Sequence, residues 1–263
     1  MADTLTTDLA VDREHMAYRT DGGIGARANL GLLVLGIDQT IEDEFRAALP
    51  DDGVALYGAR LHCDAAITPE NLRRMEDRIA PAARLLPPVD IGVIGFACTS
   101  GALVIGEAAV AERVREALPG VAVTDPVTAA LAAFRSLGAK RVALLTPYVR
   151  AINTSLRDAF QARGLAIPVM GSFNQPDDAT VARITPQSIE AAALELGAHE
   201  ACDAVFVSCT SLRVARIALR IEQRLGKPVT SSNHALAWHM LRLAGIADER
   251  PGLGRLFRTP LAG

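Results

Sequence analysis

A short motif built around a cysteine occurs twice in the chain, as Ala-Cys-Thr-Ser-Gly at residues 97–101 and as Ser-Cys-Thr-Ser-Leu at residues 208–212. Each copy ends an apolar run rich in β-branched residues, and a helical pattern follows it. The pattern predicts that Cys98 and Cys209 each lie where a buried strand ends and a helix begins. Free backbone N–H groups and the helix dipole favour an anion at such a position, so we expect them to lower the pKa of both thiols.

The two motifs belong to a longer internal duplication. The cysteines are 111 positions apart, and the same offset aligns residues 45–49 with residues 156–160. A similar offset aligns Ile-Thr-Pro-Glu with Ile-Thr-Pro-Gln, in which Thr68 and Thr185 are each predicted to cap a helix that starts with proline. The shared order of these matches predicts a chain of two related lobes.

Composition and the order of the elements favour an α/β fold. Half of the 263 residues are hydrophobic and only 4% are aromatic, as in a parallel sheet buried by Ala, Val, Leu and Ile. Helical stretches separate most of the strand-like runs, which implies right-handed βαβ units. The strand-like runs are residues 30–37, 54–61, 91–98, 121–124, 141–146, 167–173, 204–209 and 228–231. The helical stretches are residues 41–49, 70–79, 108–118, 155–162, 189–196 and 212–225.

This alternation predicts two pseudo-symmetric lobes, each a parallel sheet flanked by helices, with the active site in the cleft between them. We expect residues 1–29 to form a polar N-terminal arm, which is either flexible or an oligomer contact. Residues 30–124 are predicted to form the first α/β lobe, completed by a C-terminal helix at residues 233–245. Residues 125–232 are predicted to form the second α/β lobe.

Charge and hydropathy argue against several classes of partner. The formal net charge is −3 and no basic cluster is present, so we expect no nucleic-acid partner. The apolar runs last roughly eight residues, far short of a ~20-residue membrane span, so we expect no membrane partner. Four cysteines without a recognisable secretion signal predict reduced thiols and a cytoplasmic protein. We also expect a homo-oligomer, either a dimer or a tetramer.

Polar clusters follow the ends of four strand-like runs, where ligands of parallel sheets bind. Two of these clusters contain the candidate catalytic pair, Cys98 and Cys209. Residues 36–40 follow the first strand-like run and either contact the substrate or only cap the next helix through Asp38 or Thr40. Tyr148 either donates a hydrogen bond to a substrate carboxylate or covers the cleft. The candidate substrate-binding residues are Asp38, Gln39, Thr40, Thr99, Ser100, Tyr148, Thr210 and Ser211.

The other cysteines lack this context. A buried cysteine is ordinarily an inert small hydrophobe, but two thiols with matched neighbours favour chemistry. Cys202 precedes a strand and has no such neighbours, whereas Cys63 follows a strand end and is a secondary candidate. Nothing near the His62-Cys63 pair completes a zinc site, so no metal is expected.

With these motifs the chain resembles the aspartate/glutamate racemase superfamily. Within it, the chain is most similar to the branch that holds maleate cis–trans isomerase, arylmalonate decarboxylase and the ectoine-utilisation racemase-like proteins. The resemblance runs from about Leu30 to the end and includes residues 138–148 and 224–232, whose sequences are typical of the branch. It implies an enzyme without a cofactor, and no nucleotide loop, pyridoxal-phosphate lysine context or metal cluster stands out in the sequence.

The resemblance implies an isomerase of a small carboxylic acid, either an amino-acid or dicarboxylate racemase or a cis–trans isomerase. It places the family's catalytic cysteines at Cys98 and Cys209 and its tyrosine at Tyr148. Asp38 stands where maleate isomerases have asparagine, and this anion favours a substrate with an amino or hydroxyl group. The resemblance implies that the decarboxylases have a single catalytic cysteine, with glycine at the first cysteine position. This chain has both cysteines, so decarboxylation is a less favoured reaction than isomerisation. A non-catalytic small-acid-binding protein, such as an ectoine-utilisation accessory protein, is the remaining alternative.

Overall fold

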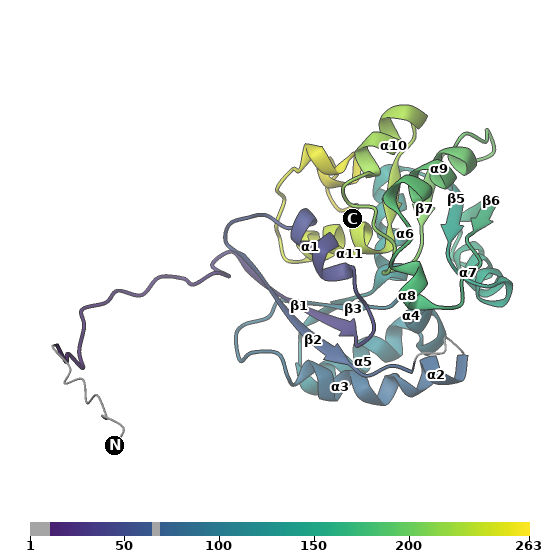
Figure 1. Cartoon of the computed structure of the whole chain (residues 1–263). Helices are drawn as coiled ribbons and strands as arrows, with labels where there is room; N and C mark the ends of the chain where they lie inside the picture. Colours follow the sequence, from purple (N-terminus) through teal and green to yellow (C-terminus); the bar gives the residue numbers. More distant parts are fainter. Residues whose placement is uncertain (1–10, 65–68) are drawn as a thin grey trace, which may run out of the picture.

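Two four-stranded parallel sheets form the framework of the molecule (Figure 1). This structure, a computed structural model, describes residues 11–64 and 69–263. The strand order is β2-β1-β3-β4 in the first sheet and β6-β5-β7-β8 in the second, so the second sheet repeats the topology of the first. The strands are β1 (Ala28–Leu35), β2 (Val54–Leu61), β3 (Val93–Ala97), β4 (Ala122–Thr124), β5 (Arg141–Thr146), β6 (Ala166–Ser172), β7 (Ala204–Val207) and β8 (Val229–Ser231). The predicted α/β fold and every predicted strand are confirmed.

Helices cover the sheets on both faces, as the continuous burial of β1 and β3 requires. Along β1, Leu33 packs towards α3 and α5, whereas Leu32 and Val34 pack towards α1 and α11. The helices are α1 (Ile41–Ala48), α2 (Pro69–Arg74), α3 (Glu76–Ala83), α4 (Thr99–Ile105), α5 (Glu107–Ala117), α6 (Pro126–Leu137), α7 (Arg150–Ala162), α8 (Asp178–Val181), α9 (Pro186–Gly197), α10 (Ala218–Leu225) and α11 (Ser232–Leu243). Short 3-10 turns at Pro251–Leu253 and Leu256–Arg258 follow α11.

Three of the predicted helices differ from the observed ones, and one of them, predicted over residues 155–162, already begins at Arg150. The stretch predicted as one helix over residues 70–79 is divided into α2 and α3 at Met75, whose N–H donates to Leu72 O in a tighter turn. The helix predicted over residues 212–225 begins only at Ala218. Residues 208–217 form a loop instead, because contacts from the first lobe bind its backbone, as described below.

Helix α11 lies against the first sheet and brings its own first residue to the carboxyl edge of the strands. Residues 232–241 are buried, and Trp238 lies in the core shared with α1 and α6. The helix crosses β3 so closely that a Cβ atom at Gly95 would lie 2.5 Å from Met240 Sδ. The glycine therefore permits the approach that fixes α11 over β3.

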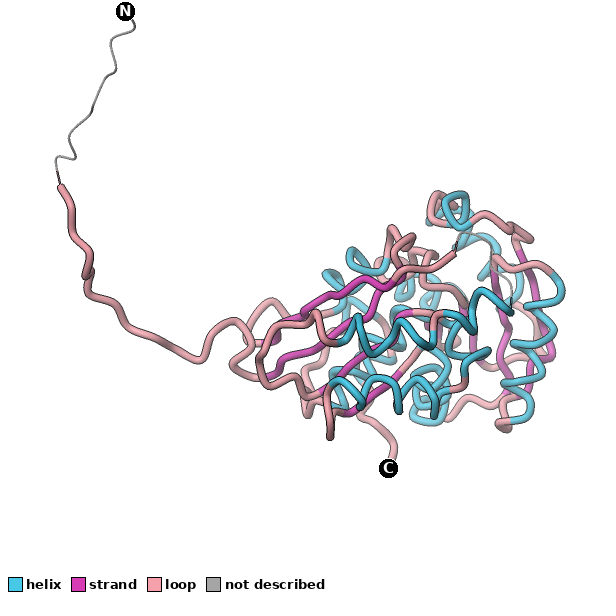
Figure 2. Tube along the Cα trace, turned by 90° about the horizontal axis from the view of Figure 1, so that it is seen from below, coloured by secondary structure: helices cyan, strands magenta, loops and turns pink. Residues whose placement is uncertain are grey.

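Caps and termini follow the sequence signals only in part. Thr185 Oγ1 accepts a hydrogen bond from Ser188 N, and Pro186 starts α9, which confirms that predicted cap. The matching Thr68 lies outside the described residues. Residues 11–23 extend away from the body of the molecule in both views (Figures 1 and 2). The boundaries of the two lobes and the role of the arm stay predictions. None of the helices in the described ranges combines the length and the apolarity needed to cross a membrane.

Candidate active site

Cys98 occupies the predicted position between a strand and a helix. It follows β3, caps α4 with extended backbone, and its Sγ accepts a hydrogen bond of 3.2 Å from Gly101 N. Ser100 Oγ lies 3.7 Å from the same sulfur. Burial raises the pKa of the Cys98 thiol to about 12, although the Gly101 N–H and the Ser100 hydroxyl oppose the rise. The expected lowering of this pKa is therefore wrong, because loss of water outweighs the hydrogen bonds.

Cys209 does not lie at the start of a helix, contrary to the prediction. It follows β7 by two residues, and its backbone has a φ of 146°, which non-glycine residues rarely adopt. Its Sγ accepts a hydrogen bond of 3.4 Å from Ser211 N. Burial raises the pKa of this thiol to about 12 as well, and the negative charge of Asp178 adds to the rise. The Ser211 N–H and the Tyr148 hydroxyl partly oppose it.

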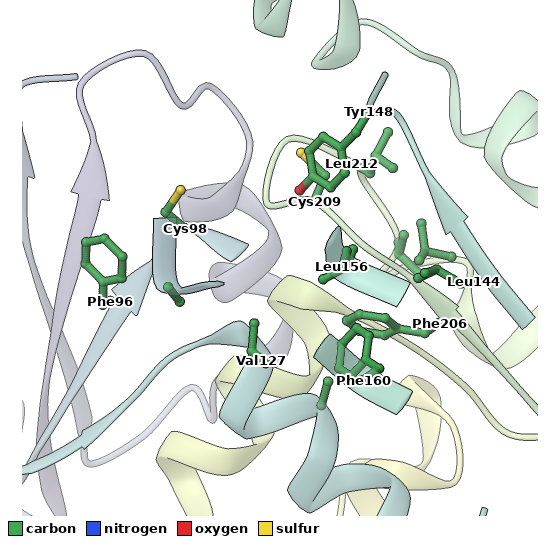
Figure 3. Close-up of a cluster of buried hydrophobic side chains, with 14 of the residues drawn as sticks. Phe96, Cys98, Val127, Leu144, Tyr148, Leu156, Phe160, Phe206, Cys209 and Leu212 are labelled. Atoms are coloured by element: carbon green, nitrogen blue, oxygen red, sulfur yellow. The ribbon is translucent and has the colours of Figure 1, made fainter. Parts of the chain in front are cut away.

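Both thiols line a single pocket. Figure 3 shows Cys98 on one side and Cys209 with Tyr148 on the other, among the buried side chains. The pocket encloses about 520 Å³ of empty space, counting the space at its mouth. The predicted site residues that line it are Asp38, Cys98, Thr99, Ser100, Tyr148, Cys209, Thr210 and Ser211. These residues come from both lobes, and the fold places them in one cavity, as the sequence predicted.

Asp38 both caps a helix and faces the pocket, so the two alternatives for it are not exclusive. Its Oδ1 accepts hydrogen bonds from the N–H groups of Thr40 and Ile41 at 2.8 and 2.9 Å. Its Oδ2 is buried and makes no hydrogen bond within the described part of the chain. Burial raises the pKa of the carboxyl group, and the two backbone N–H groups together with the hydroxyls of Thr210 and Thr40 oppose the rise. An unpartnered carboxylate oxygen in a cavity favours a ligand that donates a hydrogen bond.

Two predicted substrate-binding residues lie outside the pocket. Gln39 is exposed to solvent and does not line the cavity. Thr40 is buried, and its Oγ1 donates a hydrogen bond of 2.6 Å to Thr210 O instead of facing the cavity. Thr40 therefore supports the loop that carries Cys209, a contact between segments too distant in the chain for local patterns to indicate.

The pocket also contains residues that sequence patterns did not single out as site residues. Asp178 starts the short helix α8, and its Oδ1 accepts a hydrogen bond of 2.9 Å from Ser211 Oγ. Asp64 also lines the cavity and forms an ion pair with Arg78. Cys63, the secondary candidate, is a lining residue too. In the sequence, only the position of Cys63 after a strand end indicated this part of the pocket. Asp178 could not be predicted, because the short helix α8 lies in a segment without a periodic apolar pattern.

The charge of the lining is one-sided. Among the described residues that line the pocket, there are aspartates but no lysine, arginine or histidine. Within the described ranges, no group of His, Cys, Asp and Glu side chains is arranged to hold a metal ion. A substrate carboxylate in this cavity would therefore be bound by hydroxyl and backbone N–H groups instead of a side-chain cation.

Glu44 of α1 binds the loop that replaces the expected helix after Cys209. Its Oε2 accepts hydrogen bonds of 2.8 Å from both Val214 N and Ala215 N. The side chain is buried, and burial raises the pKa of its carboxyl group to about 7 against the opposing effect of these N–H groups. The contact competes with helix formation, because it fixes two N–H groups of residues 208–217 on another element.

This pKa predicts how stability depends on pH. Because the folded-state pKa of Glu44 is raised from 4.5 to about 7, its contribution is fully present below pH 4.5 and is lost as the pH rises through 7. Glu44→Gln keeps an oxygen acceptor but cannot ionise. We expect the free energy of unfolding of this variant, relative to wild type, to rise by about 2–3 kcal/mol between pH 4.5 and 8. Urea denaturation at several pH values measures it.

The exposed Glu42 on the same helix provides the control, because it pairs with Arg60 at the surface. Glu42→Gln is expected to leave the pH dependence of stability close to that of wild type. A Glu44→Gln curve that runs parallel to the wild-type curve over this pH range would contradict the assignment.

Comparison with known proteins shows which family the sequence matches. The sequence profile of the arylmalonate decarboxylase family matches residues 43–257, a range that includes both cysteine motifs. The arylmalonate decarboxylase of Bordetella bronchiseptica is 33% identical over 230 residues, which cover 80% of this chain and 91% of that protein. The maleate isomerase of Nocardia farcinica is 28% identical over 243 residues, which cover 89% of this chain and 96% of that protein.

A solved structure of the second relative is similar in fold. A Cys-to-Ser variant of the Nocardia farcinica maleate cis–trans isomerase, with a covalently bound succinylcysteine intermediate, superposes with a TM-score of 0.79. The match has 26% sequence identity and covers 88% of this chain and 98% of that chain. The similarity in fold therefore extends over most of both chains.

Proposed function

Because the chain belongs to the arylmalonate decarboxylase family, we propose that it is a cofactor-independent isomerase that acts on a small carboxylic acid through Cys98 and Cys209. The observation that carries the proposal is that the two thiols, one from each sheet, line the same buried pocket. Racemisation by two bases at a carbon next to a carboxylate needs groups on both faces of that carbon, and two thiols across one cavity supply them.

In the racemase version, the thiolate of one cysteine removes the α-proton and becomes a thiol. The thiol of the other cysteine delivers a proton to the opposite face and becomes a thiolate, so the pair carries one negative charge before and after the reaction, and the substrate carries that charge in the intermediate. Hydroxyl and backbone N–H groups next to Cys98 and Cys209, together with the Tyr148 hydroxyl, stabilise the negative charge that develops on the substrate carboxylate. Thr99 and Ser211 already have hydroxyl or carboxylate partners, so the Ser100 hydroxyl is the freer donor.

The thiolate has to be formed against the effect of burial. Because the pKa of both thiols is about 12, the free enzyme loses one proton to solvent only in a small fraction of molecules at neutral pH. The groups that favour a thiolate therefore affect the rate directly. They are the Gly101 N–H at Cys98, and the Ser211 N–H and Tyr148 hydroxyl at Cys209.

In the cis–trans version, the Cys98 thiolate adds to the double bond of an unsaturated acid. The electron pair of the double bond passes to the other carbon and its carboxylate, where the Cys209 thiol protonates it. After rotation about the resulting single bond, the Cys209 thiolate takes this proton back and loss of the Cys98 thiolate restores the double bond in the trans acid. The succinylcysteine intermediate of the Nocardia farcinica isomerase supports covalent chemistry of this kind in the family.

The acidic lining supports an amino or hydroxyl acid as the substrate class. The unpartnered Oδ2 of Asp38 accepts a hydrogen bond from such a group, whereas it repels a second carboxylate. Asp178 adds to the negative potential of the same cavity. A racemase of a 2-amino or 2-hydroxy acid fits this lining better than an isomerase of a dianionic acid.

Decarboxylation is the second candidate, and it is favoured by the 33% identity with an arylmalonate decarboxylase. The presence of a second thiol in the pocket supports isomerisation over it, since the decarboxylases resemble a one-cysteine arrangement. A binding protein without turnover, such as an ectoine-utilisation accessory protein, is the alternative from another class.

Deuterium uptake separates these functions. The protein is incubated in D₂O with 2-amino acids, 2-hydroxy acids, cis-dicarboxylic acids and arylmalonates, and the products are followed by NMR and chiral chromatography. A racemase incorporates deuterium at the α-carbon and produces the opposite enantiomer. Formation of a trans acid supports the cis–trans version, and release of CO₂ supports decarboxylation. Shifts in melting temperature without exchange or conversion contradict the proposed function and support the binder.

Location and assembly are part of the proposal. We propose a cytoplasmic homo-oligomer whose two lobes divide at residues 124 and 125. The free state of Cys63, Cys98, Cys202 and Cys209 supports a reducing compartment. Exposed apolar side chains on the N-terminal arm, including Met16 and Tyr18, support contact with a second copy of the chain.

A further inference from the structure

The hydroxyl group of Ser232 connects the two cysteine motifs. Ser232 is the first residue of α11, and nothing in the sequence pattern marked it as part of the site. Its Oγ accepts a hydrogen bond of 3.0 Å from Cys209 N. The same Oγ lies 2.9 Å from the hydroxyl of Thr99, the residue that follows Cys98. One buried oxygen therefore contacts the backbone of one thiol residue and the neighbour of the other.

Serine satisfies both contacts at once. The N–H of Cys209 is a donor, so Ser232 accepts there, and its own hydroxyl proton remains available for Thr99 Oγ1. Ser232 is 0% exposed and Thr99 is 1% exposed, so solvent does not replace either bond if the hydroxyl is removed. The loss would leave buried polar groups unpaired.

The backbone that Ser232 holds is strained. Cys209 has a φ of 146°, a conformation that persists only where the surroundings impose it. The next carbonyl, Thr210 O, accepts hydrogen bonds from Asn233 Nδ2 at 2.7 Å and from Thr40 Oγ1 at 2.6 Å. The start of α11 thus binds the Cys209 N–H and the Thr210 carbonyl, which flank the Cys209–Thr210 peptide unit, and α11 itself is buried against the first sheet.

We propose that Ser232 is a positioning residue that holds the Cys209 backbone in its strained conformation and sets it relative to Cys98 through Thr99. The effect of Ser232 on turnover rests on the proposed two-thiol function. Its effect on the conformation of the Cys209 backbone does not depend on that function. A thiol that moves by even 1 Å from its place can lower a rate by roughly a hundredfold, because the reacting atoms lose their alignment.

Ser232→Ala tests the proposal, with Ser231→Ala as the matched control. Ser231 is also fully buried and caps the same helix by accepting a hydrogen bond from His234 N, but it contacts neither thiol motif. Both variants remove one hydroxyl from the start of α11, and their melting temperatures and circular dichroism report whether α11 stays folded. Ser232→Cys, which restores a weak acceptor, gives a third variant of intermediate effect.

The first readout does not depend on activity. Hydrogen exchange of the Cys209 amide is expected to be at least roughly tenfold faster in Ser232→Ala than in wild type or Ser231→Ala, since that amide loses its acceptor. Modification by methyl methanethiosulfonate, resolved by peptide mass spectrometry, is expected to become severalfold faster at Cys209 relative to Cys98. Unchanged exchange of the amide and an unchanged ratio of the two thiol rates in a folded Ser232→Ala protein overturn the proposal.

The second readout uses a substrate from the deuterium panel. We expect kcat of Ser232→Ala to fall roughly ten- to a hundredfold with little change in KM, and Ser231→Ala to keep a rate near wild type. If no compound in the panel is turned over by the wild-type protein, the proposed function fails, while the exchange and modification rates still decide the role of Ser232. Equal kcat values in the two variants contradict the positioning role.

Discussion

Cys98→Ala and Cys209→Ala are each expected to lower kcat/KM by about 10²–10⁴-fold, because each variant lacks the proton donor or acceptor on one face of the substrate. The two losses are not expected to add in the double variant, since the thiols act as one unit. Initial rates with the substrate found in D₂O measure the effect. Alanine removes only a sulfur from each buried site, so both variants are expected to remain folded.

Cys202→Ala is the matched control for these variants. Cys202 is also buried and free, but its thiol donates to backbone carbonyl groups, among them His199 O, and it does not line the pocket. Its replacement is expected to leave the rate near wild type. Full activity in both Cys98→Ala and Cys209→Ala would rule out the racemase and the cis–trans mechanisms together.

Asp38→Asn is expected to change the preferred class of substrate. The asparagine oxygen can accept the same N–H groups of Thr40 and Ile41, so the cap on α1 is kept, while its amide group replaces the unpartnered Oδ2 in the pocket. A hydrogen bond to a charged group contributes about 1.5–3 kcal/mol, so kcat/KM for an amino or hydroxy acid should fall roughly 10–100-fold. The rate with a dicarboxylic acid should rise, because the repulsive charge is gone.

Asp64→Asn serves as the control for this change of charge. Asp64 lines the same pocket, and its Oδ2 lies 3.6 Å from Arg78 in an ion pair that partly balances its charge, although this oxygen makes no hydrogen bond within the described residues. We expect a smaller effect on the ratio of the two kcat/KM values than for Asp38→Asn. An unchanged ratio in Asp38→Asn would contradict the role of Asp38 in selecting the substrate.

The parts of this molecule that local patterns determine could be predicted from the sequence. Strands such as β2 and β5 are mostly apolar, and their predicted ends agree with the structure. The Thr-Pro signal at Thr185 likewise marks the start of α9 without help from distant residues. The paired cysteines were predicted to share a site because the internal duplication places each of them at the matching strand end of its own lobe, where ligands of parallel sheets bind.

The parts that long-range contacts determine could not be predicted in this way. Residues 212–217 have a helical pattern, but Glu44 binds the N–H groups of Val214 and Ala215 from a distant helix. Asp178 enters the pocket from a loop, and its sequence neighbours give no periodic signal. Ser232 is the first residue of a helix, a common position for serine, and only the tertiary structure shows that it contacts the Cys209 backbone.

The direction of the thiol pKa shifts also depends on long-range packing that local patterns do not indicate. A strand end followed by N–H groups favours a thiolate, and Cys98 does accept a hydrogen bond from Gly101 N. The pocket is so closed that burial has the larger effect and raises the pKa to about 12. The sequence carries the donors, whereas the depth of the cavity depends on how both lobes pack around it.

The central claim, that Cys98 and Cys209 act on opposite faces of one substrate, is tested most directly by deuterium exchange in the single variants. Each pure enantiomer of the substrate is incubated in D₂O with Cys98→Ala or Cys209→Ala, and exchange of its α-proton is followed by NMR. The account predicts that each variant exchanges the proton of only one enantiomer, and that the two variants act on opposite enantiomers. Exchange of both enantiomers by either variant at the wild-type rate would contradict it.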